Sequence, residues 1–142
     1  MQIEVKKLEK YIDIYDIFRL LMSQDNFKEN KISFLDSSLK NKYGKYSIIG
    51  INPYIELKEK DDKFYINDKL SDENFEEYLD RFLKENKQEN KYNLPLISGG
   101  IAYFSYDYGR KFENIKTRHK KDIDIPEAVI KFYKTYIIED IE

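Results

Sequence analysis

Apolar residues recur at helical spacing in two stretches of the chain. Between Asp13 and Ser23 they occupy positions 14, 17, 18 and 21, and Asp13 can cap the first turn. The second stretch, 71–87, carries a longer apolar stripe, made of Phe75, Tyr78, Leu79, Phe82 and Leu83. Ser71 and the acidic residues after it suit the start of a helix, and the basic residues near Lys87 suit its end. The sequence therefore predicts two amphipathic helices.

Shorter stretches are rich in β-branched and aromatic residues or alternate between apolar and polar positions, as strands do. They are residues 32–35, 46–51, 54–58, 64–66, 97–106 and 128–138. Turn-forming residues separate several of them, for example Asp61 and Asp62. Because the connections resemble hairpins rather than repeated strand-helix crossovers, we expect an α+β fold with antiparallel sheet.

Composition and charge narrow the class of protein. The chain has 142 residues, which is the size of one domain, and its aromatic content of 15% supports a packed core. The 25 Lys and Arg and the 27 Asp and Glu are interspersed and leave a net charge of −2. Such a surface has no strong field for nucleic acid or an anionic membrane. Cysteine is absent, and no apolar run reaches the roughly 20 residues of a membrane span, so we expect a cytoplasmic protein.

No local pattern specifies a catalytic site. His119 lies in the basic segment Arg-His-Lys-Lys without a nucleophile signature around it, and we interpret it as a solvated loop residue. Asp122 and Asp124 could put two carboxylates on one strand face, but a metal ion needs further ligands, and a charged loop is the preferred interpretation. Glu76 and Glu77 are expected on the solvated side of the second helix.

The glycine-containing and aromatic segments also favour a structural role. The stretch 98–110 does not have the spacing of a phosphate-binding loop or of a dinucleotide fingerprint, so its glycines are expected to allow close packing within a strand. Residues 131–134 place two aromatic residues between two lysines, which could suit single-stranded nucleic acid. With a net charge of −2, a sheet core explains this segment better.

Three blocks of the chain resemble the amino-terminal region shared by component I of aminodeoxychorismate (para-aminobenzoate) synthase and of anthranilate synthase. They are FLDSSLKNKYGKYSIIGINPY (34–54), LPLISGGIAYFSYDYGRKFENI (94–115) and DIDIPEAVIKFYKTYIIED (122–140). The segment GRKFE after SYDY leans toward the aminodeoxychorismate enzymes, with anthranilate synthase as the alternative. Ser98, Ala102 and Lys45 depart from the family pattern, and Lys45 lacks the bidentate geometry of the usual arginine.

The resemblance implies a reaction that this chain would not perform alone. Family members aminate chorismate with Mg²⁺ and with ammonia from a glutamine amidotransferase partner, and the residues for chorismate and Mg²⁺ belong to a carboxyl-terminal domain that no part of this chain matches. Residues 1–142 are thus expected to be a single amino-terminal domain, catalytically inert alone. The apolar character near the last residue, at Ile137, Ile138 and Ile141, also suggests a fragment. Its exposed apolar surface would then favour self-association.

The resemblance further implies half of a binding pocket for L-tryptophan. The matching positions are Ser37, Tyr43, Gly44, Lys45 and Tyr46. The alternative for these residues is purely structural, with Ser37 closing a strand end and Tyr46 in the core. Together with the strand pattern, the resemblance predicts two antiparallel sheets packed as a sandwich with flanking helices. A different class of interpretation is a free-standing module that binds a small molecule or a protein.

Overall fold

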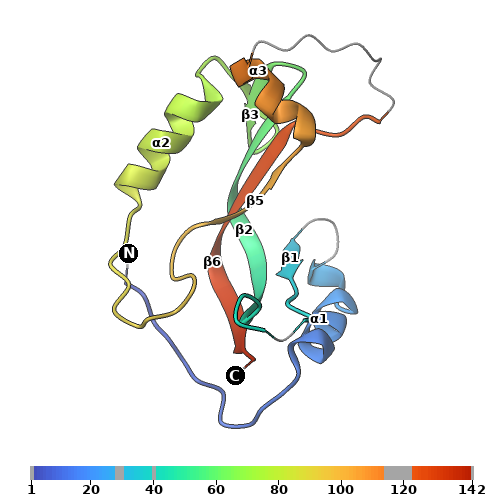
Figure 1. Cartoon of the computed structure of the whole chain (residues 1–142), viewed down its shortest axis with the longest axis vertical. Coiled ribbons are helices and arrows are strands. Elements are labelled where there is room, and N and C mark those ends of the chain that lie inside the picture. The colour runs from blue at the N-terminus through green and yellow to red at the C-terminus, as the bar shows by residue number, and fades with distance from the viewer. Residues whose placement is uncertain (1, 28–30, 40, 114–122, 142) are drawn as a thin grey trace. The chain divides into compact units, whose positions relative to one another are not determined.

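The computed structural model describes residues 2–27, 31–39, 41–113 and 123–141 (Figure 1). Its α-helices are α1 (Ile14–Met22), α2 (Phe75–Glu85) and the short α3 (Arg110–Glu113). Its strands are β1 (Ile32–Leu35), β2 (Tyr46–Lys60), β3 (Lys63–Ile66), β4 (Lys69–Ser71), β5 (Gly100–Phe104) and β6 (Ala128–Asp140). Two 3₁₀ turns, η1 (Asp25–Phe27) and η2 (Tyr106–Gly109), complete the described elements.

The strands form an antiparallel sheet in the order β4-β3-β2-β6-β5, and β1 also pairs with β2. The predicted α+β class is therefore confirmed. The prediction of two sheets is wrong in the described part of the chain, which holds one six-stranded sheet. The reason is the length of two strands: β2 has 15 residues and β6 has 13, so shorter strands that pair at different points along them join one hydrogen-bonded ladder.

Contacts divide the chain into two compact units. The first unit comprises residues 1–53, 88–99 and 133–142, and the second unit comprises residues 54–87 and 100–132. Each long strand contributes residues to both units. The two units differ in how they are held together.

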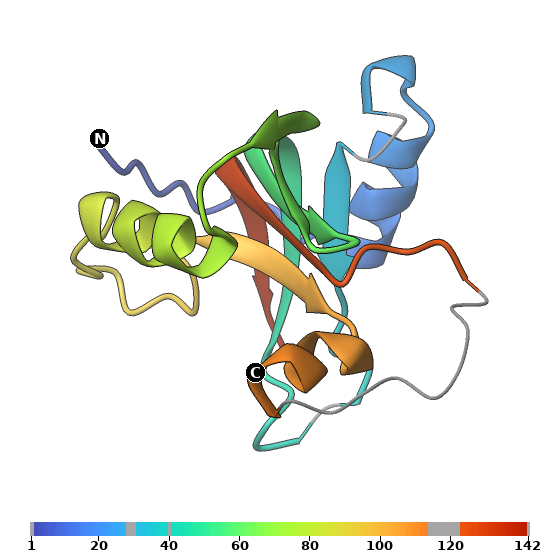
Figure 2. The same cartoon turned by 90° about the horizontal axis from the view of Figure 1, so that it is seen from above.

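The second unit has an apolar core under α2. The helix lies along one side of its strands (Figure 2), and the Phe82 ring centroid is 4.7 Å from that of Phe132 in β6. The buried members of the core are Leu57, Phe64, Phe75, Ala128, Ile130 and Phe132. Asn74 caps the helix, because its side chain accepts a hydrogen bond from the Glu77 N–H at 3.0 Å. The apolar stripe predicted for α2 is thus the face that builds this core.

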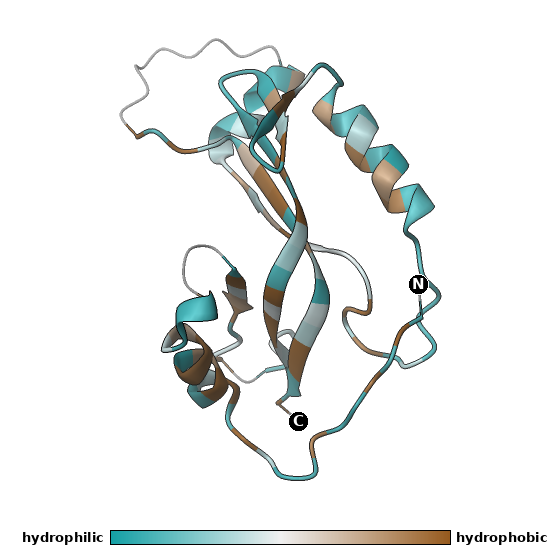
Figure 3. Cartoon of the chain, turned by 180° about the vertical axis from the view of Figure 1, so that it is seen from behind, coloured by the Kyte–Doolittle hydropathy of each residue, from teal (hydrophilic) through white to brown (hydrophobic). Residues whose placement is uncertain are grey.

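The first unit packs α1 beside β1. Phe18 and Phe34 bring their rings to 4.8 Å, and the Ile14 N–H donates to Glu139 of β6 at 3.0 Å. Asp13 caps the helix through the Tyr15 N–H, as the sequence predicts. Apolar residues run along much of α1, shown in brown in Figure 3, yet only Ile14 of this helix is buried.

Several element boundaries differ from the predictions, and the predicted strand 97–106 is shorter, at Gly100–Phe104. Residues 46–51 and 54–58 were expected to be separate strands, but they are continuous in β2 across Pro53. Ser71 ends β4 instead of starting the helix, and the cap is Asn74. The short elements β4 and α3 were not predicted, because KLS has no β-branched or aromatic residue to indicate a strand and RKFE is too short to show a helical repeat.

Candidate functional site

The motif positions lie in the connection between β1 and β2 and at the start of β2, and we call residues 36–39 and 41–47 the Ser37 turn. The Ser37 N–H donates to Ser47 Oγ at 2.9 Å, and Ser37 Oγ donates to the Tyr46 carbonyl at 2.6 Å. Ser47 Oγ in turn donates to Asp36 Oδ1 at 3.2 Å. Ser47 is only 1% exposed, and its hydroxyl is satisfied by the half-buried Ser37 and the exposed Asp36.

The tip of the Ser37 turn is shaped by Asn41 and Gly44. Asn41 Oδ1 accepts hydrogen bonds from the backbone N–H groups of Tyr43 at 2.8 Å and of Gly44 at 3.0 Å, which is an Asx-type turn. A Cβ at Gly44 would lie 2.5 Å from the Leu39 carbonyl oxygen, so a larger residue would force the backbone to move. The Lys45 carbonyl accepts from the Ile141 N–H at 2.8 Å.

The structure therefore gathers the backbone of the five predicted pocket residues but not all of their side chains. Ser37 and Tyr46 are joined directly, whereas Tyr43 leaves 83% of its surface exposed. The Ser37 hydroxyl proton is engaged by the Tyr46 carbonyl, so the lone pairs of Ser37 Oγ are what the hydroxyl can offer a ligand. An ammonium group is the kind of donor that suits such an oxygen.

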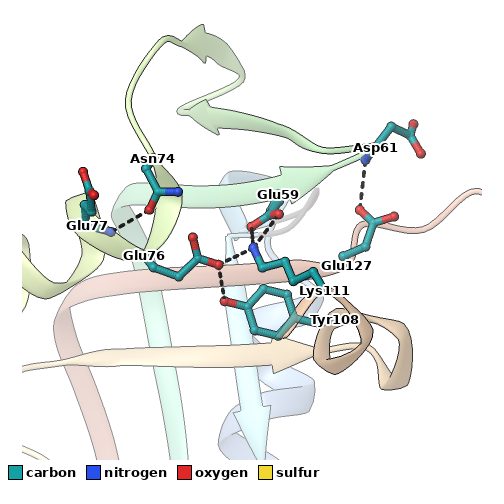
Figure 4. Close-up of polar contacts among 8 residues, drawn as sticks. All are labelled: Glu59, Asp61, Asn74, Glu76, Glu77, Tyr108, Lys111 and Glu127. Atoms are coloured by element: carbon teal, nitrogen blue, oxygen red, sulfur yellow. Dashed lines mark hydrogen bonds and ion pairs between the residues drawn. The ribbon is translucent and has the colours of Figure 1, made fainter. Parts of the chain in front are cut away.

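A second polar cluster lies in the second unit and was not predicted. Figure 4 shows Lys111 of α3 between Glu59 of β2 and Glu76 of α2, and we call these residues with Tyr108 the Lys111 clamp. Lys111 Nζ donates to both carboxylate oxygens of Glu59, at 2.7 and 2.8 Å, and forms an ion pair with Glu76. Tyr108 Oη donates to Glu76 Oε1 at 2.9 Å.

The Lys111 clamp shifts the pKa values of its members. Burial alone would raise the pKa of Glu76, but hydrogen bonds from Lys111 and Tyr108 hold that pKa below its usual value. Burial would lower the pKa of Lys111, and the two glutamates more than reverse this and raise it. Burial and the hydrogen bond to Glu76 both raise the pKa of Tyr108. The clamp thus favours the ionised forms of Glu76 and Lys111 and the neutral form of Tyr108.

An open pocket of about 310 Å³ lies against the Lys111 clamp. Its lining residues are Glu59, Asp62, Lys63, Phe64, Leu70, Ser71, Asp72, Glu73, Asn74, Phe75, Glu76 and Lys111. The two carboxylates nearest to Lys111 are already paired with it, and the described residues contain no group of three or more His, Cys, Asp or Glu side chains able to hold a metal ion. The clamp therefore serves as an anchor that ties α3 to β2 and α2.

The other candidate residues lie at the surface, in the Lys111 clamp or outside the described residues. The expectation that Glu76 faces solvent is wrong, because Lys111 and Tyr108 cover it, whereas Glu77 is exposed. Sequence spacing could not find the pairing, since Lys111 lies 52 residues from Glu59. Asp124 is exposed and pairs with Lys60 at 2.9 Å, and His119 and Asp122 lie outside the described residues.

Within the described ranges, none of the helices has the length and apolar character needed to cross a membrane.

Comparisons with known proteins find relatives among the component 1 chains of two synthases. No family model matches the chain. It is 32% identical over 115 residues to anthranilate synthase component 1 of Lactococcus lactis, which is 79% of this chain and 25% of the relative. It is 30% identical over 122 residues to anthranilate synthase component 1 of Acetivibrio thermocellus, which is 80% of this chain and 25% of that relative. It is also 35% identical over 48 residues, or 34% of this chain and 11% of the relative, to aminodeoxychorismate synthase component 1 of Klebsiella aerogenes.

The fold agrees with these relatives. The crystal structure of anthranilate synthase component I from Streptococcus pneumoniae superposes with a TM-score of 0.61 at 21% identity, covering 96% of this chain and 30% of that one. The homologues are thus component I chains of two synthases, and the chain spans about a quarter of the length of the curated relatives it matches.

Proposed function

We propose that this chain is the amino-terminal part of component I of a chorismate-utilising synthase. The observation that carries the proposal is the 115-residue match to an anthranilate synthase component 1, which takes in 79% of this chain. The six-stranded sheet and its likeness to a component I structure support the same assignment. The proposed role is to brace a carboxyl-terminal domain that binds chorismate and Mg²⁺ and works with a glutamine amidotransferase subunit.

For the reaction of the whole protein, our first candidate is amination of chorismate to 4-amino-4-deoxychorismate. The segment Gly109 to Glu113 and the match to aminodeoxychorismate synthase component 1 support it. The second candidate is formation of anthranilate, which the longer matches to anthranilate synthase component 1 favour. Identification of the reaction product distinguishes the two candidate reactions.

We further propose that the Ser37 turn supplies half of a pocket for L-tryptophan. The lone pairs of Ser37 Oγ suit the ammonium group of an amino acid, because the hydroxyl proton is already donated to Tyr46. Aromatic side chains near such a turn can line an indole ring. The second half of the pocket would come from the carboxyl-terminal domain.

The experiment that tests the reaction is turnover of chorismate by the full product of the gene, with ammonia and Mg²⁺ and with chromatographic identification of the product. We expect 4-amino-4-deoxychorismate, whereas anthranilate would select the second candidate. Residues 1–142 alone should give no turnover. Amination by these residues alone would contradict the assignment of catalysis to another domain.

Calorimetric titration of the same full product with L-tryptophan tests the pocket. Ser37→Ala should weaken binding at least about tenfold, since a charged donor would lose its acceptor. Ser23→Ala is the matched control, because Ser23 Oγ also donates to a backbone carbonyl at 2.6 Å, that of Leu20 at the end of α1. Equal affinity of the wild type and Ser37→Ala, or equal loss in both variants, would contradict the role of Ser37.

A further inference from the structure

Among the described residues, strand β5 forms one edge of the sheet and has few of the features that protect an edge. It pairs with β6 and is last in the strand order. Its sequence, GIAYF, contains no charge and no proline, and Tyr103 and Phe104 are each 46% exposed. Natural sheet edges usually carry charges, prolines or bulges that prevent pairing with another chain. The opposite edge, β4, has only three residues and begins with Lys69.

The backbone groups that β5 leaves open can be assigned from its hydrogen bonds. The Ser105 N–H donates to the Glu127 carbonyl at 2.7 Å, directly after the pair Phe104 and Ala128 in the register. Residues in an antiparallel ladder alternate between pointing their backbone groups toward one neighbour and toward the other. The N–H and C=O groups of Gly100, Ala102 and Phe104 therefore point away from β6.

We propose that β5 pairs in antiparallel orientation with β5 of a second copy of this chain, about a two-fold axis at Ala102. The three outward-facing residues then form about six inter-strand hydrogen bonds, two for each bonded pair. The contact is isologous, so each copy uses the same surface. It joins the sheets of the two copies into one.

The sequence of β5 is complementary to itself in this register. Ala102 meets its own copy at the axis, where a small side chain avoids a clash. Gly100 lies opposite Phe104 of the other strand. Its side-chain face is filled by Ile130 and Phe132 of β6, so the pair brings no second large side chain against the aromatic ring. Ile101 lies opposite Tyr103 on the other face, and pairs of β-branched and aromatic residues stabilise antiparallel strands. No like charges oppose each other, since β5 has none.

The dimer should be weak because five residues bury little surface. Stable interfaces bury roughly 1,600 Å² in total, and a single short strand provides only part of that area. Sedimentation velocity of residues 1–142 over a roughly hundredfold range of micromolar concentration should show a reversible monomer-dimer equilibrium. A monomer throughout that range would overturn the proposal and would leave the edge to a strand of another chain or domain.

Charge substitutions at the axis test the register. Ala102→Lys and Ala102→Glu each place like charges opposite each other and should raise the dissociation constant at least about tenfold. An equimolar mixture of the two variants should recover a heterodimer, because opposite charges then meet. Leu70→Lys is the matched control: it adds the same charge to an exposed residue of the other edge strand and should leave the dimer intact.

Circular dichroism should give the same spectrum for all variants, since residue 102 is exposed. The proposal fails if Ala102→Lys dimerises like the wild type, if the mixture stays monomeric, or if Leu70→Lys alone dissociates the dimer.

Discussion

The two compact units differ in the interactions that stabilise them. The second unit buries a contiguous apolar cluster, in which Phe64 and Phe75 meet edge to face at 5.5 Å, and closes it with the Lys111 clamp. The first unit buries fewer large side chains and relies on specific hydrogen bonds, such as those among Ser37, Tyr46 and Ser47. Its helix α1 leaves Tyr15 and Leu20 more than half exposed.

The difference predicts where the molecule is most easily deformed. Burial of apolar area is the main source of stability, and regions with few buried apolar contacts open first. The second unit should behave as the stable frame, and the Ser37 turn belongs to the unit that opens more readily. Hydrogen-deuterium exchange gives the direct readout, and the following substitutions test the contrast.

The largest effect is expected from Phe75→Ala. Phe75 is 2% exposed and contacts the rings of Phe64 and Tyr108, so truncation leaves a cavity in the core of the second unit. The free energy of unfolding, measured in urea, should fall by about 3–5 kcal/mol. Leu83→Ala, on the 47% exposed side of the same helix, should change it by less than about 0.5 kcal/mol. Similar losses in both variants would mean that α2 is not anchored by its apolar face.

Removal of the Lys111 clamp should have the next largest effect. Lys111→Met leaves the carboxylate of Glu59, which is 8% exposed, without its cation and should cost about 1–3 kcal/mol. The double variant Lys111→Met with Glu59→Gln should recover part of that loss, because the buried carboxylate of Glu59 no longer lacks a cation. Lys84→Met is the matched control, since its pair with Asp80 is exposed on both sides and should contribute less than about 0.5 kcal/mol. An equal loss of unfolding free energy in both variants would mean that the clamp contributes no more than a surface ion pair.

In the first unit, Gly50→Ala tests the close contact with Tyr133. A Cβ at Gly50 would lie 2.8 Å from the Tyr133 ring, so the ring must move, at a cost of about 1–3 kcal/mol. The loss should appear mainly as faster hydrogen exchange in the first unit. Gly109→Ala, where no atom lies within 4 Å of the added Cβ, should be close to neutral. A neutral Gly50→Ala would show that the first unit is softer than its contacts imply.

The smallest effect is on the pH dependence of stability. The lowered pKa of Glu76 contributes stability that is present above its unfolded value of about 4.3 and is lost as pH falls through the folded value. The raised pKa values of Lys111 and Tyr108 contribute stability that is present below about pH 10 and is lost as pH rises further. Urea unfolding from pH 3 to 11 should show both declines. Lys111→Met should flatten the acid decline and remove the contribution of Lys111 to the alkaline decline, whereas the contribution of Tyr108, which comes from burial and Glu76, should remain. A pH profile identical to that of the wild type would exclude the clamp as the source.

Local features of the fold could be predicted from the sequence, and contacts between distant residues could not. The cap at Asp13 and the bounds of β1 follow from the order of polar and apolar residues. The continuity of β2 was missed because Pro53 looks like a strand boundary, although proline is compatible with irregular or edge positions. The pairing of Lys111 with Glu59 depends on the fold bringing α3 to β2, and no local pattern encodes that. The pocket role of Ser37 came from resemblance and stays a prediction.

The two tight turns of the second unit have a consequence for the order of folding. Asp61 and Asp62, and likewise Asn67 and Asp68, have positive φ angles in the two-residue connections between β2, β3 and β4. Turns with positive φ angles match the twist of paired strands, so only two residues have to be ordered to close each hairpin. Hairpins form in about 1–10 μs. The pairing of β5 with β6 must first close a long connection. We therefore expect β2, β3 and β4 to pair with one another before the other strands join the sheet.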